Sequence, residues 1–336
     1  MINKEELAKL FNQFNNLKIG VIGDIMLDTY WWGKVDRISP EAPVPVVAVA
    51  NKDQRIGGAA NVALNIAALG ATIHVVSITG NDPEGEQLLQ LLQQNKINTT
   101  YISQSDERIT TNKIRIISRN QHMMRLDAEV TTPLSTIECD TIIQAFTAYV
   151  QAEKPHLVIL EDYNKGVLTE QVIEKVIAIC KQNGILTAVD PKRKNFFAYK
   201  NVDIFKPNLQ EAKEGLNIIG DAVTDKLLNH MHVALHEQLQ HNISFITLSE
   251  KGVYYQNDNE KGLIPTHIRS IADVSGAGDT VIAVAAVVYA ASTNVKLMAE
   301  IANIAGGLVC EEVGTVAINK AALLTECENI FVNSIL

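Results

Sequence analysis

Short apolar segments alternate with helical patterns along most of this chain, and this alternation limits the possible folds more than any other feature. Apolar and β-branched runs predict strands at residues 18–23, 71–78, 157–160, 186–189, 203–205 and 243–248. Helical patterns lie between most of them, at residues 58–69, 83–95, 135–153, 169–183 and 223–240. Strands that alternate with helices form a mostly parallel sheet covered by helices on both faces. The fold class is therefore α/β, and 336 residues with 47% hydrophobic content suffice for its core.

Polar residues follow several of the predicted strands at the points where they end. They are Gly23-Asp24, Glu161-Asp162, Asp190, Asn208 and Ser249. In open α/β sheets ligands bind outside the carboxyl ends of the strands. We therefore expect the functional site at that edge of the sheet.

Two segments interrupt the alternation of strands and helices. Residues 29–50 contain Trp31, Trp32 and a Pro-rich piece, and residues 108–127 alternate apolar and polar side chains. Both patterns are typical of antiparallel hairpins. We predict that they form one small β sheet, a lid that projects from a single domain spanning residues 1–336.

The charge of the chain is negative overall and positive in the second of these segments. A formal net charge of −9 argues against nucleic acid or an anionic membrane as the main partner. From Arg108 to Arg125 the second lid segment has five basic residues and no acidic one: Arg108, Lys113, Arg115, Arg119 and Arg125. Because arginine forks match phosphate oxygens, we expect a substrate that already carries a phosphate. A solvated strand face or a subunit contact is the alternative.

Other features of the sequence bear on oligomeric assembly and on cellular location. Apolar lid residues, including Trp31, Trp32 and residues 46–49, predict lid-to-lid packing in a homodimer. Four scattered cysteines without a CxxC pair fit a reducing cytosol better than a disulfide framework or a zinc site. The start of the chain lacks a signal-peptide pattern, and the apolar run at residues 281–291 is too short to span a bilayer. We predict a cytoplasmic protein without a membrane partner.

The stretch Asp273-Val274-Ser275-Gly276-Ala277-Gly278-Asp279-Thr280 precedes that apolar run. Backbone N–H groups at the start of a helix are unpaired and favour a phosphate. A carboxylate beside such a site can accept a proton from a substrate hydroxyl, as a kinase requires. The alternative is an ordinary loop whose aspartate caps the helix.

Several motifs together resemble the ribokinase-like (PfkB) carbohydrate kinases. Gly57-Gly58-Ala59-Ala60-Asn61 is similar to the first signature of that family, and residues 273–279 are similar to the second. Asn208-Leu209-Gln210-Glu211 resembles its Asn-x-x-Glu motif. The resemblance covers essentially the whole chain and implies a ribokinase-like fold.

Four further segments resemble a narrower group, the kinase half of the bifunctional heptose 7-phosphate kinase/heptose 1-phosphate adenylyltransferases of lipopolysaccharide synthesis. They are residues 23–28, 36–46, 118–121 with 125–127, and 162–166. This resemblance implies ATP-dependent phosphorylation of D-glycero-β-D-manno-heptose 7-phosphate at its anomeric hydroxyl. The sequence shows no nucleotidyltransferase motif before Leu336, so we expect a stand-alone kinase without a nucleotidyltransferase domain.

The resemblance also implies roles on the acceptor side. Asp279 is the expected base, and the amides of Gly276, Ala277 and Gly278 are expected to hold the phosphoryl group. The expected sugar-phosphate ligands are Asp24, Asp28, Arg37, Gly57, Gly58, Asn61, Arg119, Arg125, Asp162 and Lys165. Three arginines of this set, at positions 37, 119 and 125, are expected at the distal phosphate. Tight helix–sheet packing is the alternative for the two glycines, and a purely structural role is the alternative for Asp162 and Lys165.

On the nucleotide side the resemblance implies ATP and Mg²⁺. The expected ATP ligands are Asp190, Lys192, Asn208, Ser249, Gly252, Asn303 and Gly306. Asn208 and Glu211 are expected to arrange Mg²⁺ through water. Asp273 and Ser275 resemble a monovalent-cation site, which would suit K⁺. Close packing is the alternative for the small residues of the late helix.

Three other functions are alternatives to heptose 7-phosphate phosphorylation. A ribokinase-like kinase could act on another sugar, a sugar phosphate or a nucleoside. A nicotinamide-dependent oxidoreductase is disfavoured because no GxGxxG follows Val21-Ile22-Gly23-Asp24. A sugar sensor without turnover is disfavoured because Asp279, both signature glycine pairs, Asn208 and Glu211 are all present.

Overall fold

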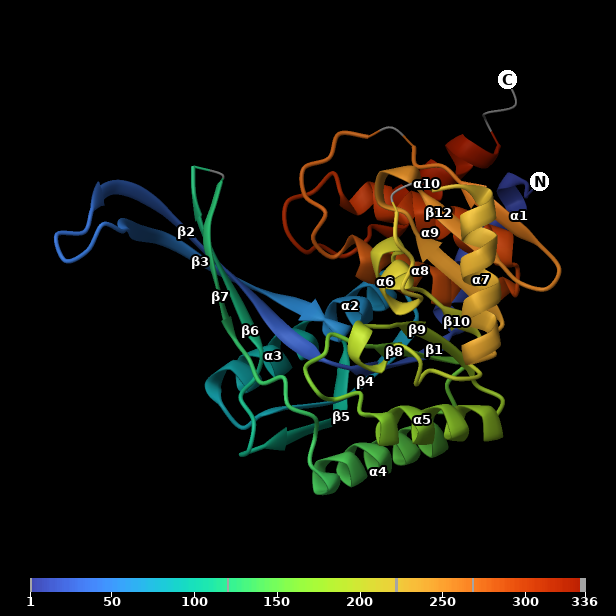
Figure 1. Ribbon diagram of the computed structural model, residues 1–336, viewed down its shortest axis with the longest axis horizontal. Coiled ribbons are helices and arrows are strands. Elements are labelled where there is room, and N and C mark those ends of the chain that lie inside the picture. Colours follow the sequence, from blue (N-terminus) through green and yellow to red (C-terminus); the bar gives the residue numbers. More distant parts are fainter. Residues whose placement is uncertain (1, 120, 221–222, 268, 333–336) are drawn as a thin grey trace.

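A computed structural model describes residues 2–119, 121–220, 223–267 and 269–332 of the chain (Figure 1). The helices are α1 (Lys4–Gln13), α2 (Ala59–Leu69), α3 (Pro83–Gln94), α4 (Thr136–Glu153), α5 (Glu170–Gln182), α6 (Leu209–Gly215), α7 (Asp225–Leu239), α8 (Ala277–Ser292), α9 (Val295–Val309) and α10 (Lys320–Phe331). The strands are β1 (Lys18–Gly23), β2 (Ile25–Ile38), β3 (Pro45–Gly58), β4 (Thr72–Gly80), β5 (Asn98–Ser105), β6 (Asn112–Ser118), β7 (Gln121–Ala128), β8 (Leu157–Glu161), β9 (Leu186–Asp190), β10 (Ile204–Phe205), β11 (Ile243–Thr247), β12 (Val253–Gln256) and β13 (Lys261–Ile264).

The main sheet has nine strands in the order β13-β12-β11-β10-β9-β8-β1-β4-β5. From β11 to β5 all neighbours pair in parallel, whereas β12 and β13 return antiparallel along one edge. The predicted α/β fold with a mostly parallel sheet is confirmed. The structure also contains each predicted strand of this sheet within a few residues.

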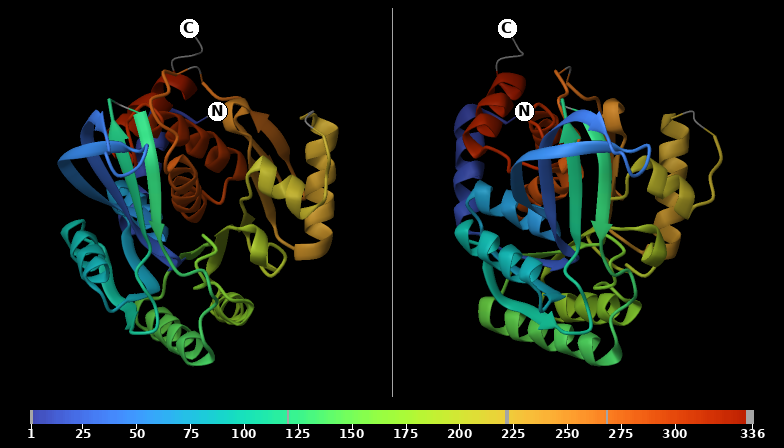
Figure 2. Two further views of the ribbon diagram at one scale, coloured as in Figure 1. Left: turned by 60° about the vertical axis from the view of Figure 1, so that its left-hand side comes forward. Right: turned by 90° about the vertical axis from the view of Figure 1, so that its left-hand side faces the viewer.

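Two hydrophobic cores lie on opposite faces of this sheet, because its strands are buried on both sides. Along β1, Ile19 and Val21 enter one core and Ile22 enters the other. The first core packs against α1, α2, α3, α8, α9 and α10, and the second against α4, α5 and part of α7 (Figure 2). Continuous apolar runs, rather than alternating ones, are the sequence pattern that such doubly covered strands produce.

Helix α8 is buried from Asp279 to Val288. This burial explains why its sequence is apolar nearly all round. It packs mainly against α9 and α2. Among the residues that the structure describes, no helix is both long and apolar enough to cross a membrane.

A second sheet of four strands projects from the main body, in the order β3-β2-β6-β7 (Figures 1 and 2). We call it the arm. Each hairpin is antiparallel, as predicted, and β2 joins β6 in parallel. The arm is longer than predicted at its root, because β2 starts at Ile25, two residues after β1 ends, and β3 runs to Gly58 at the start of α2.

The sequence did not predict β5, the edge strand next to β4. Its residues, Asn-Thr-Thr-Tyr-Ile-Ser-Gln-Ser, are mostly polar and partly exposed. Only Tyr101 and Ile102 of this edge strand pack against the two cores, so the continuous apolar run that reveals the inner strands is missing here.

Candidate active site

The carboxyl ends of four neighbouring strands bring charged residues together at one edge of the main sheet. The register sets Gly23 of β1 beside Glu161 of β8, and Glu161 beside Asp190 of β9. Asp24 follows β1 directly and Lys206 follows β10. The expected gathering of polar residues at this edge is thus present in the fold.

Helix α8 begins at the same edge and offers unpaired backbone N–H groups. Its N-cap is Gly276, which has a φ of +77° and no side chain to cap the helix. A Cβ at Gly276 would lie 2.8 Å from the Asn61 Nδ2, whereas one at Gly278 would meet open space. Within the described parts of the chain, the Gly278 and Asp279 N–H groups meet no hydrogen-bond acceptor. The helix start is therefore suited to an anion.

Asp279 lies in the first turn of α8 and is only 4% exposed. Its Oδ2 accepts a hydrogen bond of 2.8 Å from the Asn61 Nδ2, and its Oδ1 accepts one of 2.5 Å from the Tyr163 hydroxyl. Burial raises the pKa of Asp279 to about 6, against the opposing effect of these two hydrogen bonds. The carboxylate does not cap the helix, and its pKa suits a general base near neutral pH.

Asp190 stands between two lysines beside this carboxylate. Its Oδ2 lies 2.7 Å from the Lys206 Nζ and its Oδ1 lies 3.3 Å from the Lys192 Nζ, which also reaches Glu211 Oε1 at 2.6 Å. Burial favours the neutral acid, but the two lysines outweigh it and hold the pKa of Asp190 below its usual value. Lys206 was not predicted, although a basic residue directly after a strand could have suggested it.

Glu161, at the end of β8, is fully buried. Neither of its carboxylate oxygens has a hydrogen-bond partner among the described residues. Burial, together with the neighbouring charges of Asp190 and Asp279, raises the pKa of Glu161 well above its usual value. A protonated carboxyl group is the form that this environment favours.

Asp24 and Asp162 hold the loop that follows β8. The Asp24 carboxylate accepts hydrogen bonds from the backbone N–H groups of Tyr163, Lys165 and Val167, at 2.8 to 3.0 Å. Asp162 accepts one from the Asn164 N–H and one from the Tyr199 hydroxyl, both at 2.7 Å. These contacts fix the loop beside Asp279, and direct contact of either carboxylate with a sugar stays a prediction.

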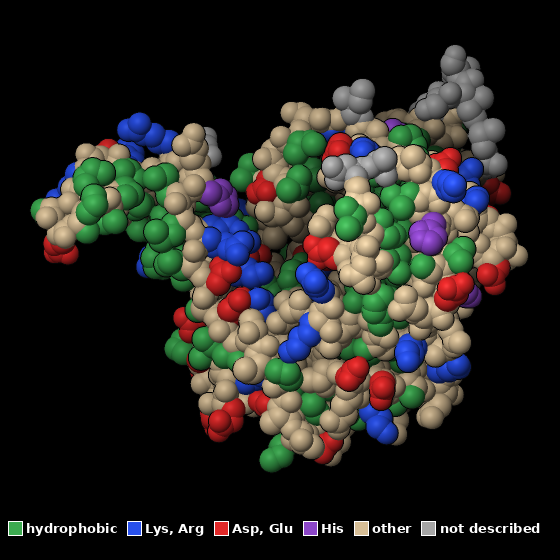
Figure 3. Space-filling view, viewed as in Figure 1, with side chains coloured by type: hydrophobic (Ala, Val, Ile, Leu, Met, Phe, Trp, Pro, Cys, Tyr) green, Lys and Arg blue, Asp and Glu red, His purple; other side chains and the backbone are tan. Residues whose placement is uncertain are grey.

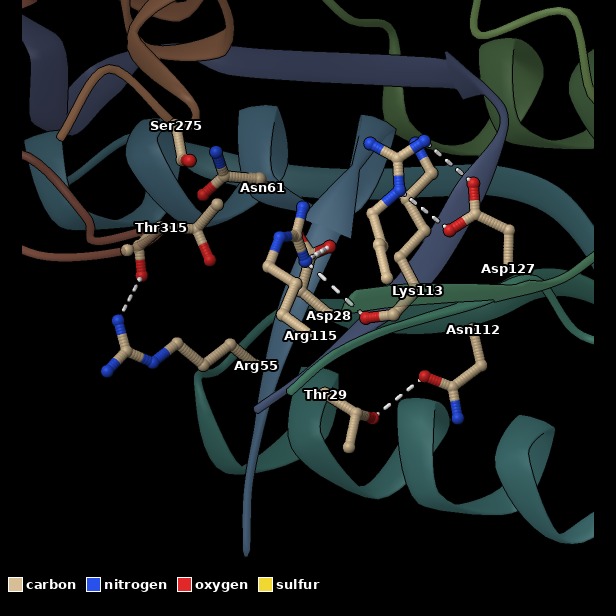
Figure 4. Close-up of polar contacts among 12 residues, drawn as sticks. Asp28, Thr29, Arg55, Asn61, Asn112, Lys113, Arg115, Asp127, Ser275 and Thr315 are labelled. Atoms are coloured by element: carbon tan, nitrogen blue, oxygen red, sulfur yellow. Dashed lines mark hydrogen bonds and ion pairs between the residues drawn. The ribbon is translucent and has the colours of Figure 1, made fainter. Parts of the chain in front are cut away.

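The root of the arm carries a set of charged side chains that face the body (Figure 4). Asp28 Oδ1 lies 2.5 Å from the Arg115 Nη1. The half-buried Lys113 has no ion pair among the described residues, and its ammonium lies 5.2 Å from the centroid of the Tyr163 ring. Burial and the nearby Lys165 lower the pKa of Lys113. Figure 3 shows Lys and Arg side chains gathered where the arm meets the body.

The other predicted basic residues are distributed differently. Arg125 pairs with Asp127 at 2.9 Å, and Lys165 pairs with Glu129 at 2.7 Å. Arg37 lies near the outer turn of the β2–β3 hairpin, and Arg119 is exposed in the β6–β7 turn beside Asn120, which is outside the described residues. Within this chain the structure does not bring Arg37 or Arg119 into contact with the other predicted residues.

Gly57 and Gly58 pack closely at the root of the arm. A Cβ at Gly57 would lie 2.5 Å from the Asp28 Oδ2, and one at Gly58 would lie 2.5 Å from the Asp24 carbonyl oxygen. Gly58 also has a φ of +61°. Side chains are thus excluded at both positions by the protein itself.

A cavity of about 700 Å³ opens beside the start of α8. It is lined by five of the residues predicted for ATP: Asn208, Ser249, Gly252, Asn303 and Gly306, and also by Ala277 and Gly278. Asp190 and Lys192 are not among its lining residues. Asn208 and Glu211 cap α6 reciprocally: the Asn208 Oδ1 accepts from the Glu211 N–H, and the Glu211 Oε2 accepts from the Asn208 N–H, both at 2.8 Å.

The predicted cation residues Asp273 and Ser275 bind each other. The Asp273 Oδ1 accepts hydrogen bonds from the Ser275 N–H and hydroxyl, at 2.9 and 2.8 Å. Its Oδ2 accepts one of 2.9 Å from the Gly314 N–H. Over the described ranges, no group of three or more His, Cys, Asp or Glu side chains could hold a metal ion.

A buried carboxylate thus lies at the start of a glycine-capped helix, beside a large cavity at the carboxyl edge of an α/β sheet, as a kinase site would require. The model of the pfkB family carbohydrate kinases matches residues 16–322, and the chain belongs to this family. The family resemblance of its motifs is confirmed.

Relatives named "Bifunctional protein HldE" match most of the chain. The protein of Syntrophotalea carbinolica is 34% identical over 96% of this chain and 65% of its own length. Those of Methylobacillus flagellatus and Chromohalobacter salexigens are 39% and 41% identical, over 92% and 91% of this chain and 63% and 62% of their own length. The chain spans less than two thirds of the length of these relatives.

Solved structures confirm the fold at low sequence identity. Arabidopsis thaliana ribokinase complexed with ribose and ATP has a TM-score of 0.71 at 17% identity, covering 92% of this chain and 98% of that one. The phosphofructokinase-2 from Escherichia coli in complex with potassium has a TM-score of 0.76 at 16% identity, covering 92% and 97%.

Proposed function

We propose that this carbohydrate kinase transfers the γ-phosphoryl group of ATP to the anomeric hydroxyl of D-glycero-β-D-manno-heptose 7-phosphate. The product would be the 1,7-bisphosphate, on the route to ADP-heptose and the lipopolysaccharide core. The observation that carries the proposal is the position of Asp279. It lies between a cavity of nucleotide size and the basic root of the arm, with unpaired N–H groups beside it.

The chemistry follows from this arrangement. The acceptor hydroxyl meets Asp279, which takes its proton as the new O–P bond forms. The N–H groups at the start of α8 stabilise the charge on the transferring phosphoryl group. Lys192 and Lys206, held by Asp190, supply positive charge nearby.

The nucleotide side is expected to hold ATP and a hydrated Mg²⁺. Asn208 lines the cavity, and Glu211 pairs with it and with Lys192, so their remaining oxygen lone pairs can accept hydrogen bonds from metal-bound water. Bound there, Mg²⁺ would neutralise charge on the phosphates. Asp273 and Ser275 are the proposed neighbours of K⁺; Asp273 already accepts three hydrogen bonds.

The acceptor side fits a sugar that carries a distal phosphate. Lys113 is a half-buried cation without an ion pair among the described residues, and Lys165 lies close enough to lower its pKa. Since Lys165 already pairs with Glu129, a phosphate would first pair with Lys113. The resemblance of residues 162–166 and of the arm segments to heptose 7-phosphate kinases supports heptose 7-phosphate as the acceptor.

A panel of acceptors in a coupled ADP-release assay tests the substrate. Heptose 7-phosphate should be turned over in preference to unphosphorylated heptose, fructose 6-phosphate, ribose and adenosine. Turnover of an unphosphorylated pentose or a nucleoside, with none of heptose 7-phosphate, would contradict the proposal and leave another ribokinase-like activity in its place.

We also propose a cytoplasmic homodimer that packs arm against arm. Large apolar side chains on the arm are exposed, including Val49 of β3 and Met124 and Leu126 of β7. An exposed sheet with such a face favours a partner sheet.

A further inference from the structure

Tyr163 is hydrogen-bonded to Asp279, the general base of the proposed reaction. Its hydroxyl donates a hydrogen bond of 2.5 Å to the Asp279 Oδ1, while Asn61 donates to the Oδ2. Its own backbone N–H donates to Asp24, so both ends of the residue are fixed. Each carboxylate oxygen of Asp279 therefore already has a donor from the protein.

The Tyr163 ring stands between the two sides of the site. The Lys113 ammonium, on the arm, lies 5.2 Å from the ring centroid, and the Lys192 ammonium, beside Glu211, lies 5.6 Å from it. An acceptor hydroxyl must come within hydrogen-bond distance of Asp279 to lose its proton there. The Tyr163 hydroxyl is already at that distance from Oδ1.

We propose that Tyr163 is a positioning residue that stands in for the acceptor hydroxyl at Asp279 and yields this oxygen when the sugar binds. The inference rests on the proposed role of Asp279 as base. Exchange of one hydroxyl donor for another at the same oxygen conserves the hydrogen bond. Until the exchange occurs, the Tyr163 hydroxyl keeps water away from the base and so protects bound ATP from hydrolysis.

The reaction then proceeds with the sugar in this position. The sugar oxygen forms a bond to the γ-phosphorus, and its proton passes to the Asp279 Oδ1. The bond between the γ-phosphorus and the bridging oxygen breaks, and its electron pair leaves with ADP. Asp279 later returns the proton to solvent.

Charged groups around Asp279 determine what removal of the Tyr163 hydroxyl would do to its titration. Glu161, Asp190 and Lys206 face it from β8, β9 and the residue after β10. Burial raises the pKa of Asp279, and the Tyr163 hydrogen bond counteracts that rise by stabilising the carboxylate. Without the hydroxyl, the base should become protonated at higher pH.

The test is Tyr163→Phe, which keeps the ring between the two lysines and removes only the hydroxyl. We expect ATP hydrolysis without sugar to rise about tenfold, as the loss of one hydrogen bond in the resting site would allow. With sugar present, the acidic limb of kcat/KM should move to higher pH. Unchanged sugar-free hydrolysis together with an unmoved acidic limb would overturn the proposal.

A matched control is Tyr149→Phe, which removes a buried hydroxyl on α4 that has no hydrogen-bond partner among the described residues. Sugar-free hydrolysis and the acidic limb should both stay as in the wild type. Melting temperatures of both variants show that the fold is intact. The readouts apply to whichever sugar the enzyme prefers, so a wrong acceptor in the proposed function and a wrong role for Tyr163 give different results.

Discussion

At the scale of single residues, Asp279 carries the strongest prediction. Asp279→Asn keeps the shape of the side chain and removes its ability to accept the proton. We expect turnover to fall by on the order of 10²–10⁴ while ATP and sugar still bind, because general base catalysis contributes about that factor. Steady-state kinetics combined with calorimetric binding measures both quantities. Turnover near that of the wild type would refute the assignment of the base.

Site residues that belong to a sequence motif could be predicted. Contacts that form only when distant parts of the chain fold together could not. Asp279, Asn61 and Asn208 stand in recognisable patterns, and the structure places Asn61 against Asp279 and Asn208 at the cavity. The contact between Tyr163 and Asp279 joins residues 116 positions apart, so no local pattern could reveal it. The separation of Arg37 from the other residues likewise depends on how far the hairpin projects.

At the scale of elements, the junction of β3 and α2 depends on Gly58. A methyl group there would lie 2.5 Å from the Asp24 carbonyl oxygen, at a φ of +61°. We expect Gly58→Ala to lower stability by more than the roughly 1 kcal/mol that a positive φ alone costs an L-residue, and to weaken sugar binding.

Gly184→Ala is the control for this prediction, because Gly184 has a φ of +65° and nothing within 4 Å of its would-be Cβ. Denaturant unfolding measures both variants. Equal losses of stability in the two variants would mean that the close approach to the Asp24 carbonyl oxygen adds no cost at Gly58.

A buried histidine group links α7 to β11 and should make stability depend on pH. His232 and His241 both contact the Ser244 hydroxyl, at 2.9 and 2.6 Å, and burial lowers the pKa of His241 to about 3. The unfolded chain, with an ordinary histidine pKa, therefore binds more protons below pH 6.5, and acid favours unfolding. At pH 5 the titration of His241 alone should cost about 2 kcal/mol of stability.

Buried carboxyl groups with a raised pKa stabilise the fold in acid, opposite to His241. The effect of His241 is therefore measured as a difference between the wild type and a variant. The unfolding free energy of the wild type minus that of His241→Gln should fall by about 2 kcal/mol between pH 7.5 and pH 5. A difference that is the same at both pH values would show that His241 titrates normally.

The secondary structure was predicted best where burial was complete on both faces. Strands β1, β8 and β9 are continuous apolar runs, and each was placed within one or two residues. The arm was recognised from the alternation at residues 108–127 and from the tryptophans and Pro-rich piece at residues 29–50, but its root was not. Ile25, Met26, Leu27 and Tyr30 are buried there, so the polar alternation that marks the outer arm is absent.

At the scale of the whole molecule, the proposed arm-to-arm dimer can be tested with one charge. Met124 on β7 is 57% exposed, and Met124→Lys should give a monomer at micromolar concentration by light scattering, because burying an unpaired ammonium is costly. Ile137→Lys is the control, since Ile137 is exposed on α4 of the main body and should leave the dimer intact. A wild-type monomer would contradict the proposed assembly.

The attachment of the arm has a consequence for how such a protein can be re-engineered. Only Asp24 separates β1 from β2, and β3 leads into α2 without an intervening residue. The β6–β7 hairpin joins the body through loops at residues 106–111 and 129–135, which can be cut and rejoined, but both ends of the β2–β3 hairpin fall inside the site. A chimera that exchanged the arm for a relative's would therefore have to import Asp24 and the start of α2 with it, so acceptor specificity and the reaction centre would be inherited as one unit.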